Sequence, residues 1–487
     1  MTDAGAEFKV DPDMPFKEVL RAIGANKRGI VFVVDRGFLK GSITDGDIRR
    51  LFLANHDLQD MNAQGMMNPY TYVLQSDASP EMTFEALRRG FGLGYRVIPR
   101  VNSEGHVVGF SHLDNLGVIP ISEPSLRGNE VAYVLECLNS NWISSTGPYV
   151  TKFETSFADL TKLENPVAVS NGTTALTLAL LALGLPSGAE VVVPTLTFAA
   201  TANAVVAAGG TPVFADVSPD TWGLSVDSIA AVLSEKTWGV IGVHLYGNPF
   251  DAEAVSQFCR SVGLVFIEDC AEAIGSRIGG RHVGAFGDAA TFSFFGNKTL
   301  TTGEGGMVFF REAMRQRDAT RLRDHGMSRE RKYWHEVIGY NMRLTNLQAA
   351  IGVAQVENAY EFIRLKRLIA ETYTVSLSST KRVELMPVPD GATSSFWLFP
   401  IVLEDSDERS RIVNSLALLG IQTRDVFPCL HQMPAFAGYR RAANTGVSES
   451  LAARGLCLPS SPNLELGQVS RIARCVSESL DPEKVLR

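Results

Sequence analysis

The sequence lacks the features that mark several large classes of protein. It has no long basic run, and its 45 Lys and Arg against 53 Asp and Glu give a net charge of −8 over 487 residues. Neither nucleic acid nor an anionic membrane is an expected partner, because both select for clustered positive charge. No apolar stretch reaches the roughly 18 residues of a membrane span, and the N-terminus has neither segment of a signal peptide. The chain is therefore predicted to be soluble and cytoplasmic.

Paired cysteine motifs are also missing. The six cysteines are scattered, with no C-x-x-C or Cys/His spacing, so we expect reduced thiols and no metal site. Hydrophobic residues make up 45% of the chain and charged residues 20%, which is ordinary for a globular protein with a large core. The length alone suggests about three structural units.

The first quarter of the sequence contains an internal repeat. In each copy, a Thr or Ser at a strand end precedes an Asp by three residues: Thr44 and Asp47 in G-S-I-T-D-G-D-I, then Ser111 and Asp114 in G-F-S-H-L-D-N-L. The first copy is predicted as strands 30–34 and 38–44 with a helix from residue 45, and the second as helix 80–89, strands 95–100 and 107–111, and short helix 113–116.

This repeat resembles a tandem pair of cystathionine-β-synthase (CBS) domains. The strand-end [ST]-x-x-D motif of that family often contacts the ribose of a nucleotide, so the resemblance implies a nucleotide effector at Thr44, Asp47, Ser111 and Asp114. A hydroxyl and a carboxylate beside helix N-terminal amides suit a ribose phosphate. The same residues also suit helix N-caps that bind nothing, and the sequence leaves both interpretations open.

From about residue 125, apolar strands alternate with helices, which is typical of an α/β sheet with crossover connections. The Pro-containing segment 119–125 is predicted as the linker, and a helix over Glu130–Asn139 as the start of the second unit. Ligands of such sheets bind at the C-terminal ends of the strands. The predicted strands are 166–169, 190–193, 212–214, 240–243, 264–267, 289–295 and 307–310.

Two motifs at these strand ends suit a phosphate on a flat ring. S-N-G-T-T-A-L (170–176) opens an apolar helix, where Gly172 allows close approach and the amides and Thr173 hydroxyl can bind phosphate. An ordinary N-cap has the same appearance. Phe198 follows the next strand and can stack on a heterocycle, although such a residue is more often part of the core.

Two further motifs carry charge. Asp269 ends an apolar strand, where a carboxylate needs a cationic partner such as a protonated pyridine nitrogen. Lys298 stands on a short connection between two apolar arms, where an amine is held rigidly for nucleophilic use, and Ser293 can add a hydroxyl to the phosphate. A lone lysine of this kind is usually solvated. In this order, however, the four motifs predict a site for pyridoxal 5′-phosphate (PLP) with Lys298 as its Schiff-base amine.

Residues 122–487 resemble the fold-type I PLP-dependent nucleotide-sugar aminotransferases of the DegT/StrS kind. Beyond the four motifs, the resemblance rests on N-W-I-S-S-T-G-P-Y-V (141–150), R-D-H-G-M (323–327), G-Y-N-M-R-L-T-N-L-Q-A-A-I-G (339–352), F-P-C-L-H-Q-M-P (427–434) and L-C-L-P (456–459). Within the family, F-F-G-N-K-T-L-T-T-G-E-G-G-M (294–307) and D-T-W-G-L (220–224) are most similar to the perosamine synthases.

The resemblance implies a role for each matching position. Lys298 bonds to the cofactor, Asp269 pairs with the pyridine nitrogen, Phe198 stacks on the ring, Glu272 lies near the ring hydroxyl, and Gly172, Thr173 and Ser293 hold the phosphate. Asn341 or Arg343 reaches the cofactor phosphate of a second subunit, which implies a homodimer with shared active sites. Trp142, Ser144, His325 and His431 lie near the nucleotide sugar.

The implied reaction moves an amino group from glutamate to C4 of a GDP-linked 4-keto-6-deoxy sugar, for glycan biosynthesis. The same reaction on a UDP- or dTDP-linked sugar is an alternative. Related PLP-dependent sugar dehydratases have a histidine in place of the lysine, so Lys298 argues against that class. A non-catalytic, nucleotide-regulated binding protein is a remoter alternative, which the intact set of Lys298, Asp269 and phosphate ligands disfavours.

The predicted fold is α/β in three parts. A CBS-pair module occupies residues 1–120 and has no counterpart in the usual family member. A PLP-binding domain with a mixed, mostly parallel sheet flanked by helices occupies 121–370, and a smaller α+β domain occupies 371–487.

Overall fold

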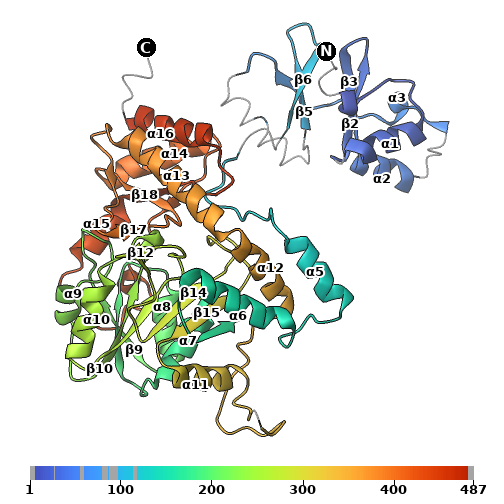
Figure 1. The fold of residues 1–487 in the computed structure, drawn as a ribbon. Helices are drawn as coiled ribbons and strands as arrows, with labels where there is room; N and C mark the ends of the chain where they lie inside the picture. Colours follow the sequence, from blue (N-terminus) through green and yellow to red (C-terminus); the bar gives the residue numbers. More distant parts are fainter. Residues whose placement is uncertain are drawn as a thin grey trace. The chain divides into compact units, whose positions relative to one another are not determined.

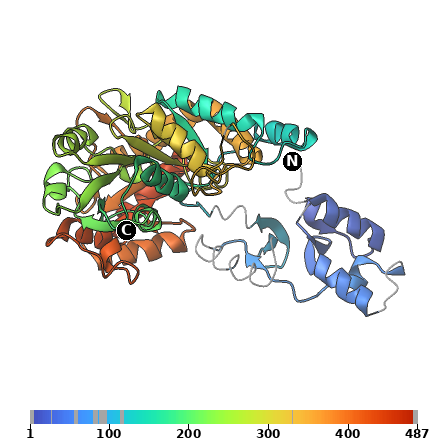
Figure 2. The same cartoon turned by 90° about the horizontal axis from the view of Figure 1, so that it is seen from below.

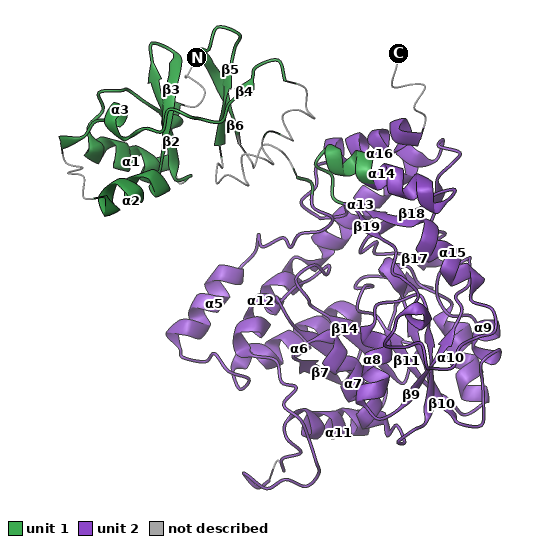
Figure 3. Ribbon diagram, turned by 180° about the vertical axis from the view of Figure 1, so that it is seen from behind, with its two compact units in different colours: residues 1–119, 414–422 green, residues 120–413, 423–487 purple. Residues whose placement is uncertain are grey.

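The computed structural model describes residues 6–26, 28–54, 60–78, 86, 97–112, 118–328 and 330–480. The chain forms two compact units (Figure 3). Unit 1 consists of Met1–Ile119 with Asn414–Gln422, and unit 2 of Pro120–Val413 with Thr423–Arg487. Among the described residues, no helix is both long and apolar enough to cross a bilayer.

Unit 1 contains two small sheets built on one plan. In each, a short strand pairs parallel with a middle strand, which pairs antiparallel with the third. This common topology supports the predicted repeat, although most of helix 80–89 and all of helix 113–116 lie outside the described residues. The elements are η1 (Ala6–Phe8), β1 (Lys9–Val10), α1 (Phe16–Asn26), β2 (Ile30–Asp35), β3 (Phe38–Thr44), α2 (Asp45–Leu53), α3 (Ala63–Met66), β4 (Leu74–Gln75), β5 (Val97–Val101) and β6 (Val107–His112).

Unit 2 is built on a seven-stranded sheet of order β7-β15-β14-β11-β10-β8-β9, in which only β15 runs against its neighbours. This confirms the predicted mixed, mostly parallel sheet. The strands are β7 (Pro166–Val169), β8 (Glu190–Pro194), β9 (Thr211–Ala215), β10 (Thr237–Val243), β11 (Val265–Asp269), β14 (Ala289–Ser293) and β15 (Gly306–Phe310). Every strand end lies within two residues of its predicted position except the start of β10, which begins three residues earlier than predicted. An almost continuously apolar run buried on both faces is a strong local signal.

Helices cover both faces of this sheet (Figures 1 and 2). Alternate side chains of each strand pack against α7, α8 and α11 on one face, and against α6, α12, α9 and α10 on the other. The bounds are α5 (Glu130–Asn139), α6 (Pro148–Thr161), α7 (Gly172–Leu183), α8 (Ala200–Ala207), α9 (Val226–Ala230), η4 (Leu245–Gly247), α10 (Ala252–Ser261), α11 (Ala313–Arg323) and α12 (Asn346–Glu357).

The C-terminal part of unit 2 has an antiparallel sheet of order β16-β18-β20-β19, and a second small sheet joins β13, β12 and β17. The predicted boundary near residue 370 falls within one long helix, α13. The elements are β12 (Arg277–Ile278), β13 (Arg281–His282), α13 (Ala359–Leu377), β16 (Glu384–Leu385), β17 (Ala392–Thr393), β18 (Phe399–Val402), α14 (Ser406–Leu418), β19 (Arg424–Asp425), η5 (Leu430–Gln432), α15 (Gly446–Arg454), β20 (Gly455–Leu458) and α16 (Leu466–Leu480).

Candidate active site

A cavity of about 540 Å³ opens at the C-terminal ends of the parallel strands of unit 2. It brings together seven of the residues predicted from the sequence, although they span more than 120 positions of the chain. They follow or end β7, β8, β11 and β14, or stand on the β14–β15 connection: Gly172, Thr173, Phe198, Asp269, Glu272, Ser293 and Lys298.

The start of α7 forms one wall of the cavity. Asn171 caps the helix by accepting a hydrogen bond from the amide of Thr174 (2.9 Å). The first amides of a helix have no acceptor within it, so those of Gly172 and Thr173 are available to an anion. A Cβ at Gly172 would lie 2.8 Å from Cβ of Ser293. Glycine is therefore what lets the helix start and the Ser293 hydroxyl converge on one small ligand group.

Asp269 ends β11 and is only 5% exposed. Its carboxylate accepts hydrogen bonds from the Thr201 hydroxyl (2.9 Å) and the Ala271 amide (3.1 Å). Burial raises the pKa of Asp269, and these bonds and the charge of Lys298 offset only part of that effect. Among the described residues, no cation forms an ion pair with this carboxylate, and a protonated ring nitrogen in the cavity would supply one.

Lys298 projects into the cavity from the connection after β14. Its Nζ lies 3.2 Å from Oε1 of Glu272, and its side chain is 12% exposed. Glu272 also accepts a hydrogen bond from the amide of Tyr246 (2.8 Å). Burial raises the pKa of Glu272, which the charge of Lys298 partly offsets. The amine of Lys298 is thereby held in the cavity by the Glu272 carboxylate.

Phe198 leaves most of its ring uncovered, with 59% of the residue exposed. Its only ring neighbour among the described residues is Phe427, with centroids 5.9 Å apart. An exposed aromatic face at the rim of a polar cavity is suited to stacking on a flat ring, whereas the alternative of a core phenylalanine would require burial.

The other predicted site residues do not line this cavity. Arg343 donates to Asp324 (2.6 Å) and to Asn341 (3.1 Å). Trp142 lines a separate hollow beside α5, and Ser144 and His325 are exposed. His431 is buried, with its ring nitrogens hydrogen-bonded to Thr195 (2.7 Å) and Glu449 (3.1 Å), which is a structural environment. Their predicted roles toward a sugar or a second subunit stay predictions.

In unit 1, the Thr44 and Asp47 side chains bond to each other and form the capping box of α2. Arg50 also donates to Asp47 (2.5 Å). Ser111 is buried, and Asp114 lies outside the described residues. The N-cap interpretation therefore describes the first pair well, and the nucleotide prediction stays untested.

Several residues of the cavity were not predicted from the sequence. Thr201 bonds to Asp269, Trp397 places its ring against Lys298, and Arg424 and Glu304 bring further charges to the wall. Thr201 follows Phe198 by three residues, so helical spacing from a stacking aromatic was a usable signal. Trp397 and Arg424 come from the C-terminal part of the chain, and no local pattern points to them.

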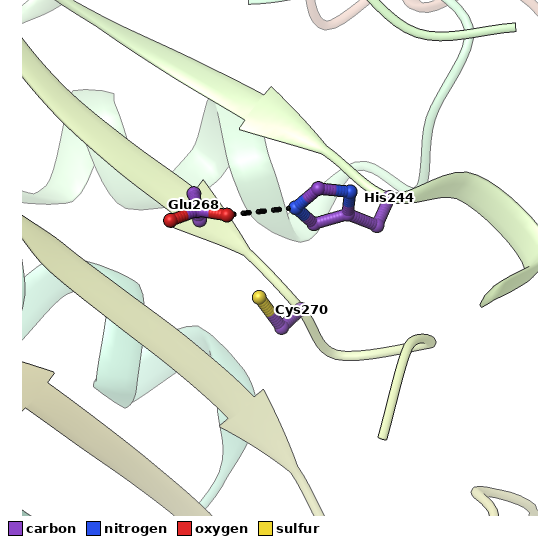
Figure 4. Close-up of side chains that lie close together, drawn as sticks. All are labelled: His244, Glu268 and Cys270. Atoms are coloured by element: carbon purple, nitrogen blue, oxygen red, sulfur yellow. Dashed lines mark hydrogen bonds and ion pairs between the residues drawn. The ribbon is translucent and has the colours of Figure 1, made fainter. Parts of the chain in front are cut away.

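Glu268 and Cys270, which flank Asp269 in the sequence, form a buried polar cluster with His244 (Figure 4). Glu268, which precedes Asp269, accepts hydrogen bonds from His244 (3.0 Å) and from the amides of Gly284, Phe286 and Gly287. Burial opposes ionisation of Glu268, but these donors outweigh it and hold its pKa below the ordinary value. With His244 and Cys270 it has metal-ligand composition, yet its oxygens are already occupied by four donors. The cluster thus ties β11 to the 284–287 turn.

The fold and this site together define a PLP-dependent enzyme of fold type I. A mostly parallel sheet presents a phosphate-sized helix start, an open aromatic face, a buried carboxylate that lacks a cation and a lysine amine in one cavity. Each fits one part of the cofactor: the phosphate, the ring face, the pyridine nitrogen and the aldehyde carbon.

The sequence belongs to one particular family of such enzymes. A profile of the DegT/DnrJ/EryC1/StrS aminotransferase family matches residues 124–477, and a CBS-domain profile matches residues 6–54. The chain is a PLP-dependent sugar aminotransferase of the DegT/DnrJ/EryC1/StrS family that carries an N-terminal CBS domain. The predicted family, enzyme class and cofactor are confirmed.

Three relatives illustrate the similarity. GDP-perosamine synthase of Escherichia coli O157:H7 is 45% identical over 360 residues, covering 74% of this chain and 98% of the relative. UDP-N-acetyl-3-dehydro-alpha-D-glucosamine 3-aminotransferase of Acidithiobacillus ferrooxidans is 38% identical over 329 residues, covering 67% and 87%. The crystal structure of the aminotransferase TlmJ from Streptoalloteichus hindustanus superposes with a TM-score of 0.71 at 32% identity, covering 75% and 100%.

Proposed function

We propose that this protein transfers the amino group of glutamate to C4 of a GDP-linked 4-keto-6-deoxy sugar, with GDP-perosamine as the product. The observation that carries the proposal is the similarity to GDP-perosamine synthase, which extends over 98% of that relative. The cavity contains the residues that the reaction requires. The amino sugar produced would serve surface-polysaccharide or other glycan assembly.

Each group in the cavity has a task in this reaction. Bound PLP supplies the electron sink that lets an amino group pass between an amino acid and a carbonyl compound. The Lys298 amine would be the base that moves the proton at the substrate carbon, a role that contributes on the order of 10²–10⁴ in rate. Asp269 keeps the ring nitrogen protonated, and Thr201 orients Asp269. The start of α7 and Ser293 bind the phosphate.

The position of Arg424 is consistent with an anionic substrate in this cavity. Arg424 lines the cavity from β19, and its side chain forms no hydrogen bond or ion pair with another described residue. The guanidinium carbon Cζ of Arg424 lies 6.0 Å from the centroid of the Trp397 ring. The carboxylates Glu272, Glu304 and Asp269 line the same cavity, so an anionic substrate needs this cation. Both a glutamate carboxylate and the diphosphate of a sugar nucleotide are anions that an arginine side chain can bind.

The substrate can be identified directly. Incubation of the PLP-loaded protein with glutamate and a panel of GDP-, UDP- and dTDP-linked 4-keto sugars, scored by product mass, should yield an amino sugar from the GDP substrate. Product from a UDP- or dTDP-linked sugar alone would replace the proposal with the alternative of the same reaction on that nucleotide sugar. Absence of half-transamination by any amino acid would favour a non-catalytic binding protein.

We also propose a homodimer with shared active sites, in which Asn341 or Arg343 reaches the cofactor of the second subunit and Trp142, Ser144 and His325 approach the sugar. Support comes from the exposed apolar residues of and beside α5: Val131, Leu135, Leu138, Trp142 and Ile143. Water-exposed apolar groups in such number are typical of an interface.

A mixing experiment tests shared sites. Lys298→Ala and Arg343→Ala protomers should each be weakly active or inactive, and should regain activity when they are unfolded and refolded together. In a mixed dimer, one site combines Lys298 of one subunit with Arg343 of the other. Failure of the mixture to exceed the sum of its parts would place Arg343 with its own subunit's site.

For unit 1 we propose a nucleotide effector bound near Thr44 and Ser111. Calorimetric titration of the full chain with adenine and guanine nucleotides should show saturable binding that Asp47→Asn weakens. Silence with every nucleotide would leave these residues with the capping role that Thr44 and Asp47 already perform.

A further inference from the structure

Trp397 makes two contacts with the turn that carries Lys298. Its indole ring faces the lysine amine, with Nζ 3.7 Å from the ring centroid. Its Nε1 donates a hydrogen bond to the carbonyl oxygen of Asn297 (2.7 Å), the residue before the lysine. The side chain is 2% exposed, so the contact with the amine is shielded from water, where a cation–π interaction is strongest.

The backbone that leads to Trp397 is held in an uncommon conformation. Phe396 has φ of +49°, a left-handed value that bulky residues adopt only where the surrounding structure holds them. The segment 394–397, which we call the tryptophan segment, is anchored at its start. The Ser394 hydroxyl donates to the Gly247 carbonyl (2.9 Å), and the Ser276 hydroxyl accepts from the Ser395 amide (3.0 Å).

Helix α13 holds both ends of the tryptophan segment with two cationic side chains. Lys366 is 1% exposed and donates to the carbonyls of Trp397 (3.0 Å) and Ser460 (2.8 Å). Arg367 donates to the carbonyl of Ser394 (3.1 Å). Lys366 has no carboxylate partner among the described residues, and burial lowers its pKa to about 7. Burying an unpaired amine costs folding free energy. We therefore expect the backbone position that Lys366 holds, at Trp397, to matter for function.

We propose that Trp397 is a positioning residue for Lys298. Its indole face receives the lysine amine whenever that amine is not bonded to the cofactor, and keeps it beside Glu272 and aimed into the cavity. The tryptophan segment fixes the position and orientation of the indole ring relative to Lys298. It does so through the left-handed backbone of Phe396 and the hydrogen bonds from Lys366 and Arg367 of α13. The inference rests on the aminotransferase assignment and is independent of which sugar is the substrate.

Accessibility of the amine tests this without substrate. In cofactor-free protein, brief methylation by formaldehyde and cyanoborohydride is followed at Lys298 by peptide mass spectrometry, with the exposed Lys381 as internal reference. Trp397→Leu is expected to raise Lys298 methylation by about 5- to 30-fold, the size of one partly desolvated cation–π contact. Phe214→Leu is the matched control, because it removes a fully buried aromatic ring that packs on Phe436, away from Lys298 and the tryptophan segment. It should change the rate less than twofold.

A second readout separates positioning from folding. With PLP bound, Trp397→Leu should lower kcat at least tenfold while the Kd for PLP and the KM for the amino donor change less than threefold. Trp397→Phe keeps a ring and loses the bond to Asn297, and should show two- to fivefold faster methylation even if the Leu variant does not fold. Lys366→Met should resemble Trp397→Phe, whereas Tyr373→Phe, which removes only a bond to the Pro459 carbonyl, should behave as wild type. Equal Lys298 methylation in wild type and both Trp397 variants would overturn the inference.

Discussion

At the scale of single residues, the site depends on charges that are kept in a largely buried cavity without full neutralisation. Asp269 and Glu272 each have a pKa raised by burial, and one lysine amine serves both. An additional positive charge on a cofactor ring would relieve this excess of acid. Binding of a positively charged cofactor ring should therefore also stabilise the ionised forms of Asp269 and Glu272.

Lys298→Ala is expected to abolish turnover while the fold is retained, because no other described lysine lines the cavity. The loss should be at least 10³-fold, since the proposed mechanism makes this residue both the cofactor's attachment point and the base. Product mass after incubation with donor and keto sugar, together with far-UV circular dichroism, measures both parts. Substantial residual amino transfer would mean that another amine carries the reaction.

Asp269→Asn should lower kcat by roughly 10²-fold or more, because an amide cannot hold the ring nitrogen protonated. Thr201→Val removes a single hydrogen bond to the Asp269 carboxylate, and a loss of about tenfold is expected. Steady-state kinetics of both variants gives the comparison. A Thr201 effect equal to that of Asp269 would show that the hydroxyl contacts cofactor or substrate itself.

At the scale of elements, the site requires α7 to begin against the end of β14. Gly172→Ala would place a methyl group 2.8 Å from Cβ of Ser293 and push the two elements apart. We expect the Kd for PLP to rise at least tenfold. Gly467→Ala, in helix α16 with nothing within 4 Å of the added carbon, is the matched control and should leave the Kd unchanged. Titration of apoprotein with PLP distinguishes the two, and tight binding by Gly172→Ala would show that α7 can shift without loss.

His282 gives the element β13 a pH-dependent stability. Its Nε2 accepts from the Gly275 amide (2.8 Å) and its Nδ1 bonds to the Val283 carbonyl, so the folded protein requires the neutral ring. Burial lowers the pKa of His282 to about 4, whereas an unfolded histidine has a pKa near 6.5. Protonation therefore favours unfolding. This stability is complete above pH 6.5 and is lost as the pH falls toward 4.

Between pH 7 and pH 5 this histidine should cost about 2 kcal/mol of folding free energy. Urea-unfolding midpoints at the two pH values should differ less in His282→Asn than in wild type. His325→Asn, at an exposed position, should keep the wild-type difference. An unchanged difference in the His282 variant would assign the acid sensitivity to other groups.

At the scale of the whole molecule, the aminotransferase and the CBS domain are separable in sequence. The Escherichia coli relative is matched over 98% of its length by about three quarters of this chain, and the aminotransferase family profile begins only at residue 124. A variant that begins at Val118 retains Ile119, which pairs with Ile421. It should bind PLP and transfer amino groups within about threefold of the full chain when no nucleotide is present. Failure to bind PLP would show that unit 1 is required for the cavity.

The sequence by itself determined the strands of the large sheet, the starts of α5 and α7, and the chemical identity of Lys298, Asp269 and Gly172. These are local properties: apolar runs, capping residues and single functional groups keep their meaning wherever the chain folds. Repeated motifs also revealed the N-terminal module, which a CBS profile confirms for its first copy.

Only the tertiary structure decided which side chains face these residues. Thr201 meets Asp269, Trp397 meets Lys298 and Lys366 holds Trp397 because the strand order β7-β15-β14-β11-β10-β8-β9 and the path of α13 bring together segments that are 30 to 100 residues apart. Local patterns do not encode that order, since it follows from how buried faces pack against one another. The same packing placed His431 in a buried hydrogen-bonded position outside the cavity, although its motif had associated it with the sugar.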